Sequence, residues 1–139
     1  MTNPTDRIEI GTEATLEQQV TFEKTIASLR EDLPPVFSTP AMIMLMENTA
    51  ARAIQSLLPD GYISVGTLVS VQHLAPTPVG SIVSSTAKVT AIDDVIITFE
   101  VTVTDSTELV GSGTHQRAVI DVDRFMKRVR RKQNSQVSF

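Results

Sequence analysis

The spacing of hydrophobic residues changes near Tyr62, and this change is the feature that most constrains the fold of the chain. Between Pro40 and Leu58 apolar residues recur every three or four positions, which predicts a helix over that range with one wide apolar stripe. After Tyr62 apolar and polar residues alternate, as in half-buried strands. We therefore expect one long apolar helix packed against an antiparallel sheet, which is an α+β architecture.

Four strands are predicted after the helix and one before it. The clearest runs from Val95 to Val103, where every second residue is apolar. Short turns at Asp93-Asp94 and Asp105-Ser106-Thr107 flank it, so the strands are expected to pair antiparallel in sequence order. The residues expected to share one face of the other strands are Ala14, Leu16, Val20 and Phe22; Val65, Thr67, Val69, Val71 and His73; Val83, Ser85, Ala87 and Val89; and alternate residues of Leu109–Ile120.

The predicted helix has a clear start and a clear end. Thr39 precedes Pro40, and a hydroxyl residue followed by proline favours a helix N-terminus. The first interpretation of Thr39 is therefore an N-cap, which does not exclude a second role in a site. Pro59-Asp60-Gly61 supplies the stop signal.

Composition bounds the number of domains and the class of partner. The chain has 139 residues, 41% of them hydrophobic, which predicts one domain over residues 1–139 with flexible ends at 1–7 and 133–139. Lys and Arg number 12 and Asp and Glu 16, and this net charge of −4 argues against nucleic acid or a membrane as the partner. The longest apolar run, Ala41–Met46, is far too short to span a bilayer.

The absence of cysteine excludes several kinds of chemistry. A disulfide scaffold, a thiolate zinc site and a cysteine nucleophile are all impossible in this chain. Only two histidines are present, so no metal is expected, and no glycine-rich phosphate loop suggests a cofactor. A chain without cysteine, and without a hydrophobic segment in Met1–Arg7, is expected in the cytoplasm.

Glu47 is the anomalous residue of the predicted helix. It lies four residues after Ile43 and three before Ala50, in the middle of the apolar stripe. A carboxylate held among apolar groups is a candidate general base or nucleophile. The alternative is a carboxylate at the edge of the stripe, paired with Arg52 or with solvent.

Three further side chains could carry chemistry. His73 shares the parity of Val71 and ends its strand just before a proline-rich segment, so we expect its imidazole to face the core. It is either a site residue or a structural histidine. His115 and Arg117 share a strand face next to two glycines, where arginine could bind an anion or pair with an acid.

The C-terminal part is strongly basic. Its cationic residues are Lys127, Arg128, Arg130, Arg131 and Lys132. We expect a solvated tail, with phosphate binding as the alternative.

Four segments of the chain form a recognisable set: Val36–Glu47, Ser64–Thr67, Val71–Gly80 and Gly111–Ile120, in this order. Together they resemble the hot-dog thioesterases of the fluoroacetyl-CoA thioesterase type, and the likeness extends over about residues 8–132. The resemblance implies a hot-dog fold, in which a curled antiparallel sheet of about five strands wraps a long central helix. It also implies a homodimer with active sites at the subunit interface.

The resemblance also implies roles for individual residues. Thr39, Glu47 and His73 would form the catalytic triad, and Gly66 and Arg117 would support the substrate carbonyl or its water. Phe37 is retained as a substrate-binding residue. The chain departs from the family at residues 28–34, where the phenylalanines of the family's lid are missing, so thioester hydrolysis is better supported than fluoroacetyl specificity.

Helix geometry adds a constraint on this triad. Eight residues of regular helix span roughly 12 Å, so Thr39 and Glu47 of one chain cannot both touch one thioester carbonyl. Each site is therefore expected to take these residues from different subunits, unless Thr39 lies on a strongly bent first turn. The predicted activity is hydrolysis of a small acyl-CoA by Glu47; the alternative is a non-catalytic module that binds acyl-CoA or a small acid.

Overall fold

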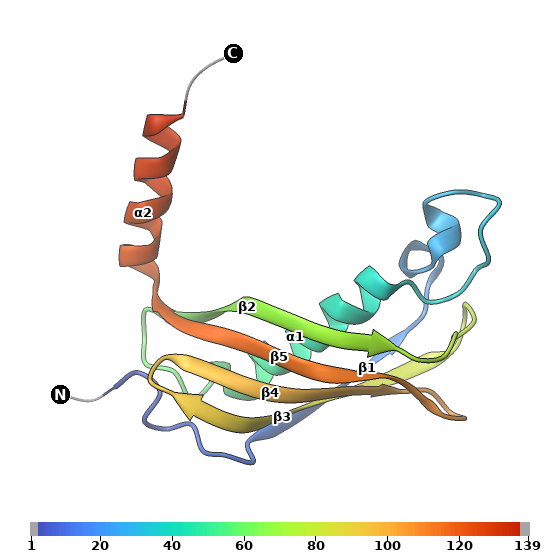
Figure 1. The fold of residues 1–139 in the computed structure, drawn as a ribbon, viewed down its shortest axis with the longest axis horizontal. Helices are drawn as coiled ribbons and strands as arrows, with labels where there is room; N and C mark the ends of the chain where they lie inside the picture. Colours follow the sequence, from blue (N-terminus) through green and yellow to red (C-terminus); the bar gives the residue numbers. More distant parts are fainter. Residues whose placement is uncertain (1–2, 137–139) are drawn as a thin grey trace.

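The alternating segments form one antiparallel sheet, and the apolar segment before them forms a helix on one of its faces (Figure 1). The structure is a computed structural model and describes residues 3–136. Its elements are β1 (Glu13–Gln19), the 3-10 turns η1 (Phe22–Lys24) and η2 (Ile26–Ser28), α1 (Thr39–Gln55), β2 (Tyr62–His73), β3 (Ile82–Asp93), β4 (Ile96–Thr104), β5 (Leu109–Asp121) and α2 (Val122–Ser135). The α+β architecture is thus confirmed.

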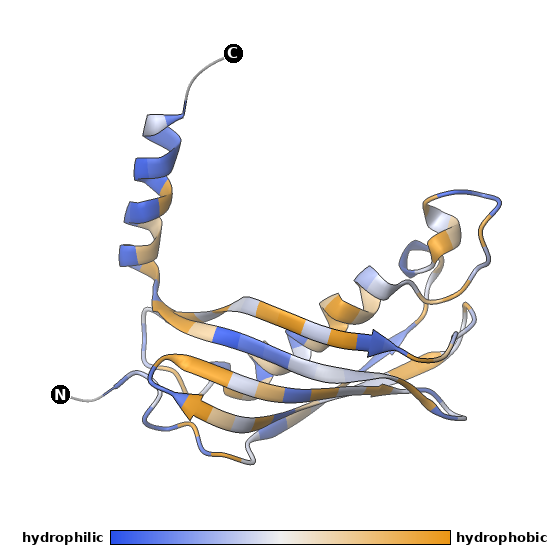
Figure 2. Cartoon of the chain, in the orientation of Figure 1, coloured by the Kyte–Doolittle hydropathy of each residue, from blue (hydrophilic) through white to orange (hydrophobic). Residues whose placement is uncertain are grey.

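The core lies between α1 and the sheet. On α1 the side chains of Met42, Met46 and Ile54 are fully enclosed. Figure 2 shows the first half of α1 as mainly hydrophobic. Burying side chains of this size stabilises the fold by about 1.5–3 kcal/mol each. The residues that they meet on the sheet include the expected alternating sets Val83, Ala87 and Val89 on β3 and Ile97, Phe99, Val101 and Val103 on β4.

The strands do not all pair in sequence order. The order in the sheet is β1-β3-β4-β5-β2, so only β3, β4 and β5 form the expected meander. β2 pairs with β5 and lies at an edge, and β1 occupies the position beside β3. The prediction failed because residues 74–81 carry Pro76 and Pro78 and do not form a hairpin turn. The expected turns on both sides of β4 are present, and Asp94 takes a positive φ of 54° in the first.

A β-bulge in β2 changes which residues share a face. Gly66 lies opposite Arg117 and Leu68 opposite Gln116, so Thr67 is the extra residue. Directly opposed residues share a face, so Gly66 and His73 both face α1. Val65 lies opposite Ala118 and faces the other way, so its expected place beside Val69 and His73 was wrong.

The helix boundaries differ slightly from the predicted ones. Ser38 is the N-cap of α1, and its Oγ accepts a hydrogen bond from the Ala41 amide at 3.2 Å. Thr39 is therefore the first helical residue and not the cap. The helix ends at Gln55, and Leu58 donates its amide to the Gln55 carbonyl in a tightened last turn.

The start of the chain is more ordered than expected. Within residues 3–7, the side chains of Asn3 and Thr5 both donate hydrogen bonds to Asp94, which anchors this segment beside the β3–β4 turn. Phe22 lies in η1 and is 57% exposed, so it does not continue β1 as predicted. The expected flexibility of residues 1–2 and 137–139 lies outside the described residues.

The basic segment expected to be a solvated tail is the helix α2, which starts at the N-cap Asp121. Its boundaries include residues 133–135, which were expected to be flexible. Figure 1 shows α2 projecting from the end of β5 and not lying on the sheet. None of its side chains is buried. In the described part of the chain, no helix combines the length and apolarity required to cross a bilayer.

Gly113 is where the sheet requires a glycine. A Cβ there would meet the Ser70 carbonyl oxygen and would lie 2.6 Å from the Val71 Cα on β2. Gly113→Ala should therefore lower the free energy of unfolding by about 1–3 kcal/mol or more, because backbone atoms cannot yield as side chains do. Thr114→Ala, at the adjacent exposed position, should change it by less than about 0.5 kcal/mol. Urea unfolding measures both, and equal stability of the two variants would contradict this explanation.

Candidate active site

Side chains from α1, β2 and β5 form two polar groups on the α1-facing side of the sheet. The first, called the Thr39–His73 pair, joins the start of α1 to the end of β2. The second, called the Glu47 cluster, consists of Glu47, Ser64, Gly66, His115 and Arg117. Every residue proposed for the site from the sequence lies in or beside one of these groups.

The Thr39–His73 pair depends on the capping of α1. Because Ser38 supplies the cap, the Thr39 hydroxyl is free to contact His73, and Thr39 Oγ1 lies 2.8 Å from His73 Nδ1. The Phe37 ring stands edge-on to the imidazole, with ring centroids 6.2 Å apart. These three residues line a hollow of about 320 Å³, together with Ile26, Val36, Leu74, Ala75 and Pro76.

The His73 imidazole is held in its neutral form. Burial lowers its pKa below the ordinary value, because the charged ring loses solvation. Its Nε2 is buried and has no hydrogen-bond partner among the described residues. A buried polar atom without a partner is costly, so this nitrogen is suited to meet a substrate or a second subunit.

Glu47 lies over the backbone of Gly66. A Cβ on Gly66 would lie 3.0 Å from Glu47 Oε1 and 3.3 Å from the His115 ring. The bulge at Thr67 turns Gly66 toward α1, and the absence of a side chain leaves room for the carboxylate. Glu47 is half-buried and Gly66 is exposed, so this position is open at the edge of the sheet.

His115 and Arg117 form a fixed network beneath Glu47. The Leu68 carbonyl, 2.8 Å from His115 Nδ1, can only accept, so Nδ1 carries the proton. Nε2 is then unprotonated and accepts from an Arg117 NH group at 3.1 Å. Arg117 also donates to the hydroxyl and the carbonyl of Ser64, at 2.8 and 3.0 Å. His115 is 1% exposed, and it stacks on Phe99.

The charges of the Glu47 cluster act on one another. Burial lowers the pKa of Arg117, and the nearby Glu47 carboxylate opposes this change. Burial is also the main cause of the lowered pKa of His115. The Glu47 carboxylate makes no hydrogen bond or ion pair with any residue in the described part of the chain, where the single ion pair joins Arg30 to Asp32. The carboxylate is therefore close to the positive charge of Arg117 but forms no ion pair with it.

Within one chain, the Thr39–His73 pair and the Glu47 cluster lie at separate positions along α1. α1 is continuous from Thr39 to Gln55, so the strongly bent first turn that was the alternative is not present. Thr39 and Glu47 are eight residues apart on this helix, roughly 12 Å along its axis. In one subunit the hydroxyl and the carboxylate cannot reach the same carbonyl carbon.

Sequence reasoning missed Ser64. It is buried, and it holds Arg117 through both its side chain and its backbone. The sequence signal that could have identified Ser64 is its place two residues before Gly66, which puts both residues on the same face of the strand. Among residues 3–136 no group of three or more His, Cys, Asp or Glu is placed to hold a metal ion.

Comparison with known proteins identifies relatives over most of the chain. A curated fluoroacetyl-CoA thioesterase from Streptantibioticus cattleyicolor is 35% identical over 133 residues, which cover 91% of this chain and 96% of that protein. A crystal structure of the fluoroacetyl-CoA thioesterase FlK superposes with a TM-score of 0.86 at 34% identity, covering 91% of this chain and 98% of FlK.

More distant structures support the fold. A hot-dog-like protein from Thermanaerovibrio acidaminovorans superposes with a TM-score of 0.87 at 24% identity, covering 99% of this chain and all of that one. The predicted hot-dog fold is therefore confirmed. The model of the family described as fluoroacetyl-CoA-specific thioesterase matches residues 20–123. The chain belongs to the fluoroacetyl-CoA-specific thioesterase family.

Proposed function

We propose that the protein hydrolyses a small acyl-CoA thioester to the free acid and coenzyme A. The observation that carries this proposal is the unpaired Glu47 carboxylate over Gly66, in a member of a thioesterase family. The name of the 35% identical relative, a fluoroacetyl-CoA thioesterase, supports the substrate class. A further structure of FlK is described as a complex with acetyl-CoA.

Glu47 activates the attacking group. As a general base it removes a proton from water while the water oxygen bonds to the thioester carbon. The tetrahedral oxyanion then collapses, the carbon–sulfur bond breaks, and the thiolate takes the proton from Glu47. As a nucleophile, Glu47 would attack the same carbon, the carbon–sulfur bond would break, and coenzyme A would leave as a thiolate from a mixed anhydride. Water would then hydrolyse the anhydride to the free acid and the Glu47 carboxylate, and the proton released would go to the thiolate. Both routes need an ionised carboxylate.

Thr39, His73 and Gly66 act on the carbonyl and on its orientation. If the Thr39 hydroxyl donates to His73 Nδ1, Nε2 carries the proton and can donate to the oxyanion. Gly66 lies beside the bulge at Thr67 and has no side chain, which leaves room for the substrate carbonyl next to Glu47. Phe37 packs against His73 and restricts the orientation of its ring.

The complete site forms between two subunits. β2 is an exposed edge strand that carries partly exposed Ile63, Leu68 and Val69, so it is suited to pair with β2 of a second copy. Antiparallel pairing would bring the His73 end of one β2 beside the half of the partner's strand that contains Gly66. The Thr39–His73 pair of one subunit would then face the Glu47 cluster of the other.

The segment between η2 and Phe37 sets the acyl preference. In residues 28–35 no aromatic side chain is present, and Leu29 is 75% exposed. We therefore propose a wider acyl range than fluoroacetyl alone. The cytoplasmic location expected from the sequence stays a prediction.

Replacing Glu47 by glutamine keeps the shape of the side chain and removes its basicity. Glu47→Gln should lower kcat by about 100-fold or more, the usual contribution of a general base. Release of free thiol from short, branched, aromatic and halogenated acyl-CoA substrates measures this, with no background from a chain that lacks cysteine. Glu100→Gln, an exposed carboxylate on β4, is the control. Wild-type turnover in Glu47→Gln would refute the role, and saturable binding without any turnover in the wild type would favour a binding module.

Mixed dimers test whether the site is shared. One subunit carries Thr39→Ala with His73→Gln and the other carries Glu47→Gln, each with its own affinity tag. If the sites form between subunits, one of the two sites is intact and the mixed dimer should recover about half of the wild-type turnover. If each chain builds its own site, no intact site exists and activity stays at the level of the parents.

His73 should also shape the pH dependence. Its pKa is lowered by burial, so the neutral ring persists below the ordinary histidine value of about 6.5, and protonation removes it only at lower pH. The value of kcat/KM should therefore stay level through pH 6.5 and fall in more acidic solution. The His73→Gln variant keeps a donor amide without a titration, so its residual activity should lack this component of the acidic fall. An unchanged profile in that variant would contradict the assignment.

A further inference from the structure

α2 concentrates the positive charge of the protein. It carries six of the twelve Lys and Arg residues of the chain but only one acidic residue, Asp123. The cations are Arg124, Lys127, Arg128, Arg130, Arg131 and Lys132. The rest of the chain is acidic. The family match ends at residue 123, so family membership by itself predicts nothing about this helix.

None of these cations is neutralised within the described residues, where the single ion pair joins Arg30 to Asp32. Several lie three or four positions apart, as Arg124 and Arg128 do, and like charges at this spacing destabilise a helix by a few tenths of a kcal/mol per pair. An anionic ligand would relieve this repulsion.

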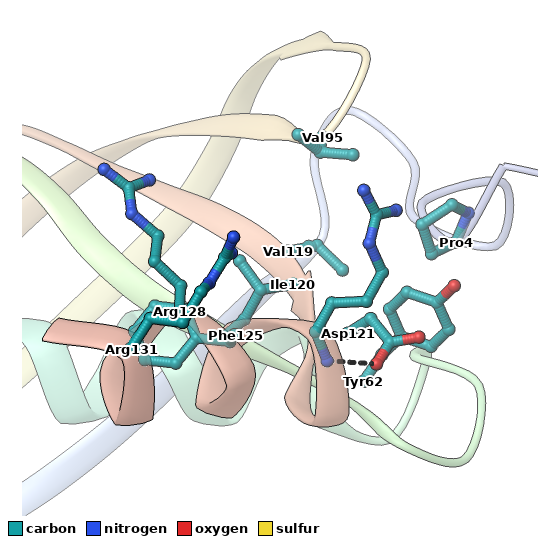
Figure 3. A pocket seen from close by; sticks show the side chains of 10 residues that line it. Pro4, Tyr62, Val95, Val119, Ile120, Asp121, Phe125, Arg128 and Arg131 are labelled. Carbon is teal, nitrogen blue, oxygen red and sulfur yellow. Dashed lines mark hydrogen bonds between the residues drawn. The ribbon is translucent and has the colours of Figure 1, made fainter. Parts of the chain in front are cut away.

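A hollow lies between α2 and the end of the sheet (Figure 3). Its volume is about 530 Å³, within the usual range for small-molecule sites. Figure 3 shows Arg128 and Arg131 on the α2 side, and Pro4 and Tyr62 at the other end. The lining residues are Pro4, Tyr62, Val95, Val119, Ile120, Asp121, Arg124, Phe125, Arg128 and Arg131.

The hollow combines two chemistries. Three arginines of α2 line it, and the planar guanidinium forms paired hydrogen bonds with phosphate. Tyr62 and Phe125 add flat aromatic surface, on which a nucleobase can stack. The acidic residue among the lining, Asp121, has its Oδ1 engaged by the Arg124 amide at 3.1 Å.

The hollow lies within reach of the Glu47 cluster. Val119 lines the hollow, and it is two residues from Arg117 on the same face of β5, a separation of roughly 7 Å. The pantetheine arm of coenzyme A has thirteen bonds between sulfur and the first phosphorus, which is equivalent to about four extended residues or roughly 15 Å. The arm is longer than the separation between Arg117 and Val119, so it can extend from the Glu47 cluster into the hollow.

We propose that the hollow beneath α2 binds the phosphorylated nucleotide end of the acyl-CoA substrate. Arg124, Arg128 and Arg131 bind its phosphates, and Tyr62 and Phe125 contact its adenine. This inference rests on the proposed thioesterase function, because it extends the same substrate from its acyl group to its nucleotide. A hollow lined by two aromatic rings fits a nucleotide. The acidic remainder of the chain would repel a membrane surface or a nucleic acid.

The test compares two substrates that differ in the nucleotide alone. Full-length wild type and the Arg128→Gln/Arg131→Gln variant are assayed with an acyl-CoA and with the matching acyl-pantetheine thioester, which lacks phosphates and adenine. The variant should raise KM for the acyl-CoA about tenfold or more, because hydrogen bonds to charged groups are strong. It should leave kcat, and both constants for the pantetheine thioester, within about twofold.

The matched control is Arg130→Gln/Lys132→Gln, which removes two cations of α2 that do not line the hollow. An equal KM increase in this control, an equal increase with the pantetheine thioester, or no increase at all would overturn the proposal. A change in the oligomeric mass of the Arg128→Gln/Arg131→Gln variant would also overturn it. So would binding of the wild type to anionic phosphatidylserine vesicles but not to coenzyme A.

Calorimetric titration with coenzyme A separates this inference from the proposed function. If the wild type hydrolyses neither thioester but binds coenzyme A, and the Arg128→Gln/Arg131→Gln variant binds it about tenfold more weakly, the thioesterase proposal fails and the nucleotide site stands. If both thioesters are hydrolysed and the variant is unchanged, the nucleotide site fails and the thioesterase stands.

Discussion

The bulge at Thr67 is the constraint on which the polar face of this protein depends. Without the extra residue, a regular β2 could not turn both Gly66 and His73 toward α1, because they differ in parity. With it, the backbone of Gly66 lies under Glu47 while His73 still reaches Thr39. One inserted residue in an edge strand thus positions both ends of the proposed chemistry.

Local patterns predicted the helix and the β3–β4–β5 meander, because each of these depends on neighbouring residues and short turns. Two features could not be read in this way. The pairing of β2 with β5 joins segments about 50 residues apart, and no turn residue specifies it. The bulge at Thr67 changes which residues of β2 face α1. Nothing in the sequence indicates this change, because Val65 before the bulge and Val69 after it continue the same alternating pattern.

The candidate site was predicted residue by residue, but its supporting contacts were not. Glu47 stood out as a carboxylate in an apolar stripe, and His73 by its parity. Ser64, and the proton on His115 Nδ1, emerged only when opposing strands were aligned. The same limit applies to α2, where the run of cations is solvated as expected, but the helix and its Asp121 cap were not predicted.

The connection between β1 and α1 is built differently from the rest of the chain. Its base is closed by a hydrogen bond from the Ile26 amide to the Val36 carbonyl and by the bridge between Thr25 and Phe37. Between these points the chain is largely exposed and contributes nothing to the core. Substitutions and changes of length are therefore tolerated there at little cost in stability. If this segment selects the acyl group, as proposed, that selection can diverge over evolutionary time while the proposed catalytic groups stay in place.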